Sequence, residues 1–219
     1  MSYLPCVEVE PTSPATAAVI WLHGLGADGH DFEGIVPELK LAADAGIRFV
    51  FPHAPSIPVT INNGFVMPAW YDILDINFDR KVDEAQLLKS AQAVHALIDR
   101  EIERGIDSQR IVIAGFSQGG AVGLQAALTY PKPLAGLLAM STYFATINSI
   151  NPHPANSELS IEVHHGTFDP VVAEQHGRNT IAYLKKMGHD ANYRTYPMEH
   201  SVCLEQINDI ANWLKTVLK

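Results

Sequence analysis

The chain has 219 residues, of which 47% are hydrophobic and 18% charged, a composition that excludes extensive disorder and suits a single domain over 1–219. Its formal net charge of −9 disfavours nucleic acid and anionic membrane surfaces as partners, because both require a basic face. No apolar run approaches the roughly 20 residues that span a bilayer, and the N-terminus lacks a signal-peptide pattern. We therefore expect a cytoplasmic protein without stable membrane insertion.

Short apolar runs alternate with longer stretches of helical periodicity. The runs at 19–22 and 111–114 are apolar on both faces, which is typical of strands in a parallel sheet that is covered on each side. In 84–104, apolar residues recur at helical spacing. This alternation predicts an α/β fold with a mostly parallel, doubly wound sheet. The expected strands are 17–22, 47–51, 111–115, 134–140, 160–164 and 191–196, and the expected helices are 84–104, 117–129, 171–187 and 207–218.

Residues 53–82 interrupt this alternation with a long connection that is rich in proline, aromatic and aliphatic residues. A connection of this length inside a compact domain is usually functional or disordered, and its aromatic content argues against disorder. We expect a lid-like or pocket-wall excursion that leaves an apolar groove for substrate, with simple core packing as the alternative. Trp70, Ile73 and Leu74 are the substrate-binding residues that we predict from this segment.

The strongest motif is Gly-Phe-Ser-Gln-Gly at 115–119. It follows the apolar run at 111–114 and opens a helix-compatible stretch, which is the setting of a nucleophile elbow. The serine of such an elbow lies in a strained turn, and the flanking glycines avoid collisions with neighbouring backbone. The helix that begins there directs its N–H groups towards the reaction centre. Ser117 is therefore predicted to be a nucleophile, the alternative being a chance occurrence of a common motif.

A serine hydroxyl is a weak nucleophile unless a base takes its proton. In hydrolases built around such an elbow, the serine is followed along the chain by Asp or Glu and then by His. Asp169 comes after the predicted strand 160–164, and His200 comes after the strand 191–196. Catalytic groups in open α/β sheets gather at these carboxyl ends of strands. We predict that Ser117, Asp169 and His200 form a catalytic triad.

A glycine-rich segment at 24–29 admits two interpretations. Its Gly-x-Gly-x-x-Gly pattern matches a dinucleotide fingerprint, but that fingerprint requires an acidic residue at the end of the next strand, which here ends in Phe-Pro-His at 51–53. The His-Gly pair at 23–24 instead fits an oxyanion loop, whose backbone N–H acts together with that of the residue after the serine. We predict Leu25 and Gln118 as these two backbone donors.

Ten histidines and two cysteines raise the question of a metal site. The histidines form no His-x-x-x-His or comparable array, and Cys6 and Cys203 are isolated in the sequence. Two distant thiols without a secretion signal also argue against a disulfide scaffold. We expect neither a metal nor another cofactor.

Five segments in this order resemble the carboxylesterase and acyl-protein thioesterase family of small α/β-hydrolases. The resemblance implies an α/β-hydrolase fold without a large cap domain, cleaving carboxylic esters or thioesters. It also implies Ser117, Asp169 and His200 as the triad, with Leu25 and Gln118 as the oxyanion pair. The segments are Leu-His-Gly-Leu-Gly at 22–26, Ala-Trp-Tyr-Asp at 69–72, Gly-Phe-Ser-Gln-Gly-Gly at 115–120, His-Gly-Thr-Phe-Asp-Pro-Val-Val at 165–172 and Met-Glu-His-Ser at 198–201.

Three positions depart from the family pattern. Glu199 stands where a glycine usually precedes the histidine, Ala173 where a proline often follows the two valines, and Thr142 where a glycine is common. None of these departures removes a catalytic group. Glu199 adds a negative charge next to His200 in the sequence, and Thr142 is expected to alter one wall of the pocket.

These features predict a serine carboxylesterase, of bacterial type, that hydrolyses short- to medium-chain esters through an acyl-enzyme. The alternatives are an acyl-protein thioesterase, a lysophospholipase and a serine peptidase. An inactive hydrolase fold that serves as a binding module is the alternative from a different class. The expected partners are a small-molecule ester or thioester and, in a homodimer, a second copy of the chain.

Overall fold

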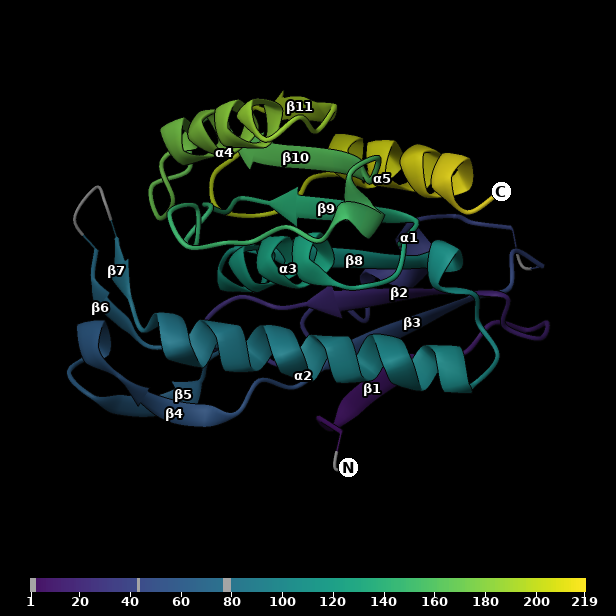
Figure 1. Cartoon of the computed structure of the whole chain (residues 1–219), viewed down its shortest axis with the longest axis horizontal. Helices are drawn as coiled ribbons and strands as arrows, with labels where there is room; N and C mark the ends of the chain where they lie inside the picture. Colours follow the sequence, from purple (N-terminus) through teal and green to yellow (C-terminus); the bar gives the residue numbers. More distant parts are fainter. Residues whose placement is uncertain (1–2, 43, 77–79) are drawn as a thin grey trace.

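The computed structural model describes residues 3–42, 44–76 and 80–219. A seven-stranded sheet forms its centre, in the order β1-β3-β2-β8-β9-β10-β11 (Figure 1). Neighbouring strands run parallel except β1, which pairs antiparallel with β3. The strands are β1 (Cys6–Val9), β2 (Ala17–Leu22), β3 (Ile47–Pro52), β8 (Ile111–Phe116), β9 (Gly136–Met140), β10 (Ser160–Gly166) and β11 (Ala191–Tyr196).

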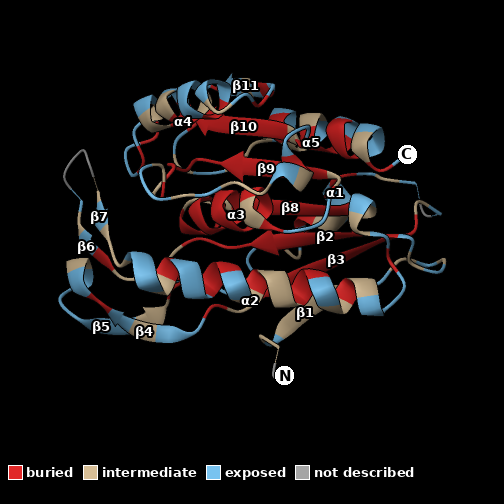
Figure 2. Ribbon diagram, in the orientation of Figure 1, coloured by how far each residue is buried: buried red, intermediate tan, exposed pale blue. Residues whose placement is uncertain are grey.

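Helices cover both faces of the sheet, and each layer has its own core (Figures 1 and 2). On one face, side chains such as Leu87, Val122 and Leu184 pack against the strands. On the other face, Ile35 and Ile210 do the same. Each such burial contributes about 1.5–3 kcal/mol, which is why the strands are apolar on both sides. The helices are α1 (Ile35–Glu38), α2 (Glu84–Glu103), α3 (Gln118–Thr129), α4 (Glu174–Lys186) and α5 (Leu204–Val217).

The predicted doubly wound architecture is confirmed, with small shifts at element ends. Helix α2 begins where Asp83 caps it, its side chain accepting a hydrogen bond from the Gln86 N–H, and it ends just before Gly105, whose φ of +96° breaks the helix. Helix α4 starts at Glu174, three residues later than the predicted 171. Strand β1 was not predicted, because it is short and only half-buried.

Residues 53–76 and 80–82 form two small hairpins beside the sheet, and positions 77–79 of the predicted excursion lie outside the described residues. Strands β4 (Ser56–Val59) and β5 (Phe65–Pro68) pair through the turn η1 (Thr60–Asn62), and β6 (Ile73–Asp75) pairs with β7 (Lys81–Val82). The turn closes where Asn63 and Gly64 adopt positive φ angles of 55° and 74°. The hairpins lie on the left in Figure 1, where the parallel strands have their carboxyl ends. The apolar residues of this segment divide: Trp70, Tyr71 and Ile73 are buried, whereas Phe65 and Val66 are exposed.

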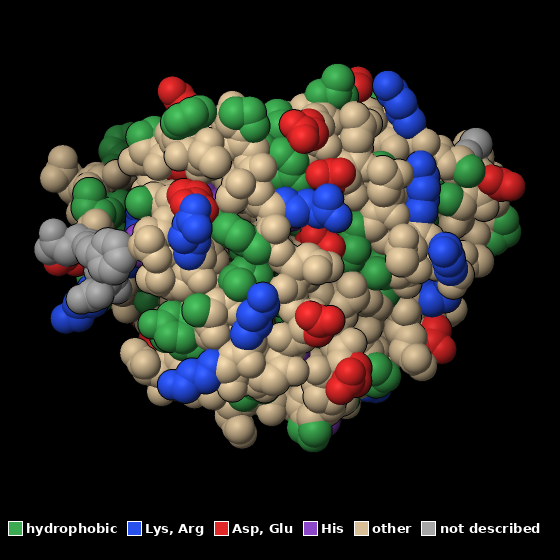
Figure 3. All heavy atoms as spheres, turned by 90° about the horizontal axis from the view of Figure 1, so that it is seen from above, with side chains coloured by type: hydrophobic (Ala, Val, Ile, Leu, Met, Phe, Trp, Pro, Cys, Tyr) green, Lys and Arg blue, Asp and Glu red, His purple; other side chains and the backbone are tan. Residues whose placement is uncertain are grey.

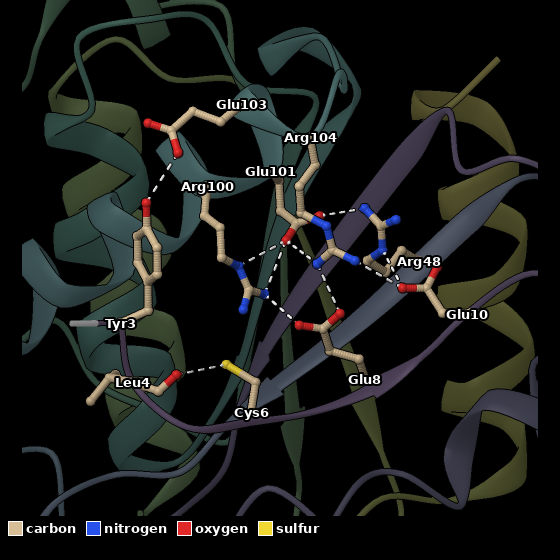
Figure 4. A network of polar contacts seen from close by, with 10 residues as sticks. All are labelled: Tyr3, Leu4, Cys6, Glu8, Glu10, Arg48, Arg100, Glu101, Glu103 and Arg104. Atoms are coloured by element: carbon tan, nitrogen blue, oxygen red, sulfur yellow. Dashed lines mark hydrogen bonds and ion pairs between the residues drawn. The ribbon is translucent and has the colours of Figure 1, made fainter. Parts of the chain in front are cut away.

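A network of ion pairs holds β1 against α2 and β3 (Figure 4). Its centre is Glu101, which is fully buried and whose carboxylate lies 2.7 Å from the Arg48 guanidinium and 3.0 Å from that of Arg100. Such a buried carboxylate is tolerated only when it is fully paired. The complete network consists of Glu8, Glu10, Arg48, Arg100, Glu101 and Arg104.

Strand β11 is the opposite edge of the sheet, and its outer residues are polar. Arg194 lies 3.2 Å from the carboxylate of Glu162 on β10 and 3.3 Å from that of Asp209 on α5. Across the surface seen from this side, basic and acidic side chains are interspersed (Figure 3). This edge therefore carries fixed charges of both signs.

Candidate active site

Ser117 lies in the turn between β8 and α3, in the backbone conformation of a nucleophile elbow. Its φ of 54° and ψ of −120° are strained for a residue with a side chain. The flanking glycines are needed for space. A Cβ on Gly115 would lie 2.4 Å from the Gly119 carbonyl oxygen, and one on Gly119 would lie 2.5 Å from the carbonyl oxygens of Leu22 and His23. The collisions expected from the sequence are thus present at both positions.

Asp169 and His200 meet beyond the carboxyl ends of β10 and β11, at the end of the sheet where Ser117 follows β8 (Figure 1). The Asp169 Oδ2 atom lies 2.6 Å from His200 Nδ1. Its Oδ1 atom accepts backbone hydrogen bonds from Val171 at 2.9 Å and Val172 at 2.8 Å. Burial raises the pKa of Asp169, but these hydrogen bonds together lower it below its ordinary value. An ionised Asp169 holds the proton of His200 on Nδ1 and leaves Nε2 as the basic nitrogen.

His165 stabilises the loop that carries Asp169. It is fully buried, its Nε2 lies 2.7 Å from the Val172 carbonyl oxygen, and the same nitrogen is 3.6 Å from Asp169 Oδ2. Burial lowers the pKa of His165, so the ring is neutral and donates from Nε2 to the carbonyl. The sequence showed a histidine here but gave no sign of this role, because the contact depends on how the loop folds back.

The loop after β2, which carries Leu25, is held by the neutral side chain of His23. The ring has Nδ1 2.7 Å from the Gly24 carbonyl oxygen and accepts the Ala54 N–H at Nε2, at 3.1 Å. Burial lowers the pKa of His23, which agrees with a ring that accepts at Nε2 and donates from Nδ1. The loop is also tied by the Trp70 indole N–H, which donates to the His23 carbonyl oxygen at 2.9 Å.

The side chain of Gln118 makes contacts that the sequence did not predict. We expected only its backbone N–H to matter. In the structure its buried amide accepts the backbone N–H of Trp70 at 2.8 Å and donates to the carbonyl oxygen of Tyr71 at 2.7 Å. This amide therefore joins the residue after Ser117 to Trp70 and Tyr71 of the 53–82 excursion.

An apolar cavity of about 370 Å³ borders Ser117. Of the three predicted substrate-binding residues, Ile73 lines this cavity. Trp70 and Leu74 do not: Trp70 is buried, and Leu74 is 39% exposed. The residues that line the cavity are Leu25, Ile61, Ile73, Ile76, Arg80, Ser117, Gln118, Tyr143, Pro170 and Val171.

A second cavity, of about 460 Å³, lies next to the candidate triad. His200 and Phe116 border it, and their rings are 4.7 Å apart. Asp31 and Glu38 add carboxylates to a wall that is otherwise largely apolar. The serine and the histidine thus face two different cavities.

The glycine-rich segment at 24–29 has a packing explanation. A Cβ on Gly29 would lie 2.5 Å from the carbonyl oxygen of Phe51, so this glycine permits close approach to β3.

Among the described residues, no three His, Cys, Asp or Glu side chains gather in an arrangement that could hold a metal ion. Within 3–42, 44–76 and 80–219, no helix has the length and apolar character needed to cross a membrane.

A parallel sheet with a strained serine after β8, an Asp–His pair after β10 and β11 and an early glycine loop defines a serine hydrolase of the α/β-hydrolase fold. The phospholipase/carboxylesterase family model matches residues 5–218, and the chain belongs to this family. The predicted fold, without a large cap, and the predicted family are therefore confirmed. The chain is a hydrolase of carboxylic esters or thioesters.

Relatives match over nearly the full chain. Acyl-protein thioesterase 1 of Neurospora crassa is 42% identical over 96% of this chain and 90% of its own length. The protein of the same name from Gibberella zeae is 36% identical, over 94% and 92%. Among solved structures, Arabidopsis thaliana SOBER1 is 33% identical with a TM-score of 0.86, covering 93% of this chain and 99% of its own. Zea mays acyl-protein thioesterase 2 is 26% identical with a TM-score of 0.86, covering 99% and 100%.

Proposed function

We propose that this protein is an acyl-protein thioesterase, which removes an acyl chain from a cysteine side chain of another protein. The relatives named acyl-protein thioesterase 1 favour this function over the short- to medium-chain carboxylesterase that we expected. The structural observation that carries the proposal is the apolar cavity beside Ser117. The aliphatic residues that make up half or more of its lining suit an acyl chain, because each buried methylene contributes about 0.8 kcal/mol.

In the proposed mechanism, His200 Nε2 takes the proton of the Ser117 hydroxyl as its oxygen attacks the thioester carbonyl carbon. The backbone N–H groups of Leu25 and Gln118 stabilise the resulting oxyanion. The carbon–sulfur bond then breaks, and His200 returns the proton to the departing sulfur. Water, activated by the same imidazole, releases the acyl group from the serine, while Asp169 keeps His200 oriented.

The two cavities divide the substrate between them in this proposal. The acyl chain occupies the cavity beside Ser117, since the carbonyl carbon must bond to the serine oxygen. The leaving cysteine and its polypeptide depart past His200, because this imidazole supplies the proton to sulfur. The cavity bordered by Phe116 and His200 gives them a route.

The described residues of 53–82 form one wall of the acyl cavity in this proposal, within a single hydrolase domain. Ile61, Ile73 and Ile76, which come from the two hairpins, line the cavity together with Ser117. The segment is thus a wall built into the site rather than a separate cap. A cytoplasmic location agrees with a substrate of this kind.

The test compares leaving groups at constant acyl chain. A palmitoylated cysteine peptide, lysophosphatidylcholine with a palmitoyl chain and p-nitrophenyl esters from acetate to palmitate are assayed for kcat/KM. We expect kcat/KM for the thioester peptide to exceed that for the other palmitoyl substrates by at least about tenfold. A tenfold ratio corresponds to about 1.4 kcal/mol of transition-state binding. Faster turnover of acetate or octanoate esters would instead identify a carboxylesterase. Absence of turnover and of fluorophosphonate labelling at Ser117 would identify a binding module.

A further inference from the structure

The two predicted oxyanion donors come from distant parts of the chain. Leu25 follows β2, and Gln118 follows β8. Trp70, from neither strand, contacts both segments: its indole N–H donates to the His23 carbonyl oxygen at 2.9 Å, and its backbone N–H donates to Gln118 Oε1 at 2.8 Å. One residue thus bridges the two halves of the candidate oxyanion site.

We propose that Trp70 is a positioning residue that sets the spacing of the two oxyanion donors. This inference rests on the proposed function, which assigns those donors to Leu25 and Gln118. The His23 carbonyl that Trp70 binds lies two residues before Leu25. The Gln118 amide that it binds belongs to the second donor residue itself. A shift of Trp70 therefore moves both donors relative to the serine.

Trp70 is itself rigidly held. It is 1% exposed, and its carbonyl oxygen accepts a hydrogen bond from the Ser90 hydroxyl on α2. Its ring centroid lies 5.1 Å from that of His23. The Gln118 amide also binds the next carbonyl, that of Tyr71, so one side chain pairs with two successive backbone positions. Because Trp70 is held by these contacts, it fixes the positions of the two segments that it joins.

Trp70 does not line the cavity beside Ser117. It therefore acts through the donors rather than on the substrate. Oxyanion donors must lie about 2.7–3.1 Å from the developing anion, and loss of one costs about 10²–10³-fold in kcat. Displacing donors without removing them costs less. We expect a decrease in kcat of about 10- to 100-fold when the bridge is broken.

Trp70→Phe tests the bridge, because it keeps an aromatic ring and removes the indole N–H. The expected result is a lower kcat with KM nearly unchanged. A long-chain alkyl boronic acid provides a second readout: its boron bonds to the Ser117 oxygen, the serine proton passes to His200, and the tetrahedral adduct carries the negative charge of an oxyanion. Its affinity should fall by the same factor as kcat, whereas the affinity for the free fatty acid should not change.

Trp21→Phe is the matched control. Trp21 is also 1% exposed, and its indole N–H has no acceptor in the described part of the chain. The Trp21→Phe variant loses the same ring volume as Trp70→Phe but breaks no hydrogen bond between the two segments.

Gln118→Met and Gln125→Met form a second pair of variants. Both glutamines are buried on α3, but the Gln125 amide binds Thr146, away from the donors. Gln118→Met should reproduce the effect of Trp70→Phe if that variant does not fold.

Two results would overturn the inference. One is a Trp70→Phe protein that differs from Trp21→Phe only in melting temperature. The other is a boronic acid affinity that stays at the wild-type value while kcat falls. Failure of the proposed function is distinguishable, because a wild type that prefers oxygen esters still binds boronic acid and still reports the donor spacing.

Discussion

Two polar regions of this molecule are stabilised by different kinds of contact. At the β1 edge, Glu101 is surrounded by guanidinium groups, and six charged side chains form ion pairs (Figure 4). At the active-site end, Asp169 is held by one imidazole and two backbone N–H groups, and His23 and Gln118 use neutral hydrogen bonds. The first region holds the chain together with ion pairs between carboxylates and guanidinium groups. In the second region, the His200 imidazole keeps Nε2 for proton transfer in the proposed mechanism.

Removing the Ser117 hydroxyl, the proposed nucleophile, should have the largest effect on the active-site region. Ser117→Ala is expected to lower kcat by about 10⁶-fold, the scale seen when a triad serine is removed. The fold should survive, because alanine is smaller than serine. Intact-mass analysis after fluorophosphonate treatment should show one adduct on the wild type and none on the variant. Ser141→Ala, at a buried serine with a φ of 46°, should keep the adduct.

The carboxylate of the proposed triad should have the next largest effect. Asp169→Asn should lower kcat by about 10⁴-fold, because the imidazole loses the partner that fixes its tautomer. Asp190→Asn is the control: Asp190 precedes β11 and lies at the opposite end of that strand from His200. Steady-state kinetics on one substrate measure both. Similar losses in the two variants would show that Asp169 has no special role.

The ion-pair network should respond in stability and not in chemistry. Glu101→Gln leaves three arginines without their shared buried partner, and such a loss costs about 3–5 kcal/mol. Urea unfolding should show this decrease, while kcat/KM of the folded fraction stays at the wild-type value. Arg178→Gln, which breaks the exposed pair with Glu174 at 2.8 Å, should cost less than about 1 kcal/mol. A fall in kcat/KM of Glu101→Gln would mean that the two regions are coupled.

Mild acid should lower stability through the buried histidines and not through the ion-pair network. Burial lowers the pKa of His23, His95 and His165 from the ordinary 6.5. As the pH falls below 6.5, the unfolded chain binds more protons than the folded chain does. These histidines therefore lower the free energy of unfolding as the pH falls, until their folded pKa values are reached. The hydrogen bond with Arg48 lowers the pKa of Glu10 from its ordinary value of 4.5. The contribution of Glu10 to the free energy of unfolding is therefore lost only when the pH falls below about 4.5. The free energy of unfolding should therefore decrease from pH 7.5 to 5.5.

A variant at His95 checks the origin of that decrease. His95 lies on α2, and its Nε2 is 2.8 Å from the Ala126 carbonyl oxygen, far from the triad in the chain. His95→Gln keeps a donor and removes the titrating group, so the pH dependence of unfolding should become shallower. An unchanged slope would assign the acid sensitivity to the remaining buried histidines.

The smallest expected effect concerns the cavity wall. Ile73→Ala should reduce the preference for octanoate over acetate esters by about fourfold, the equivalent of one buried methylene at about 0.8 kcal/mol. Leu74→Ala should leave this ratio unchanged, because Leu74 is 39% exposed and does not line the cavity. The ratio of kcat/KM values is the measurement. A larger effect at Leu74 would place the acyl chain outside this cavity.

The sequence predicted what depends on local pattern. Apolar runs located β2 and β8, and the strand-turn-helix setting singled out Ser117. The order of residues along the chain singled out Asp169 and His200. The bridge formed by Trp70 was not predictable, since its partners lie 47 and 48 positions away and no periodicity records such a contact. For the same reason, the exposed Leu74 could not be told from the buried Ile73.

The charges along β11 have a consequence for association between molecules. An exposed edge strand offers unpaired N–H and C=O groups to any other strand, which is how sheets of separate molecules fuse and aggregate. Arg194, between the carboxylates of Glu162 and Asp209, lies on this edge. A second chain that extended the sheet here would have to strip water from these charges. These charges therefore disfavour extension of the sheet by a second chain at the β11 edge.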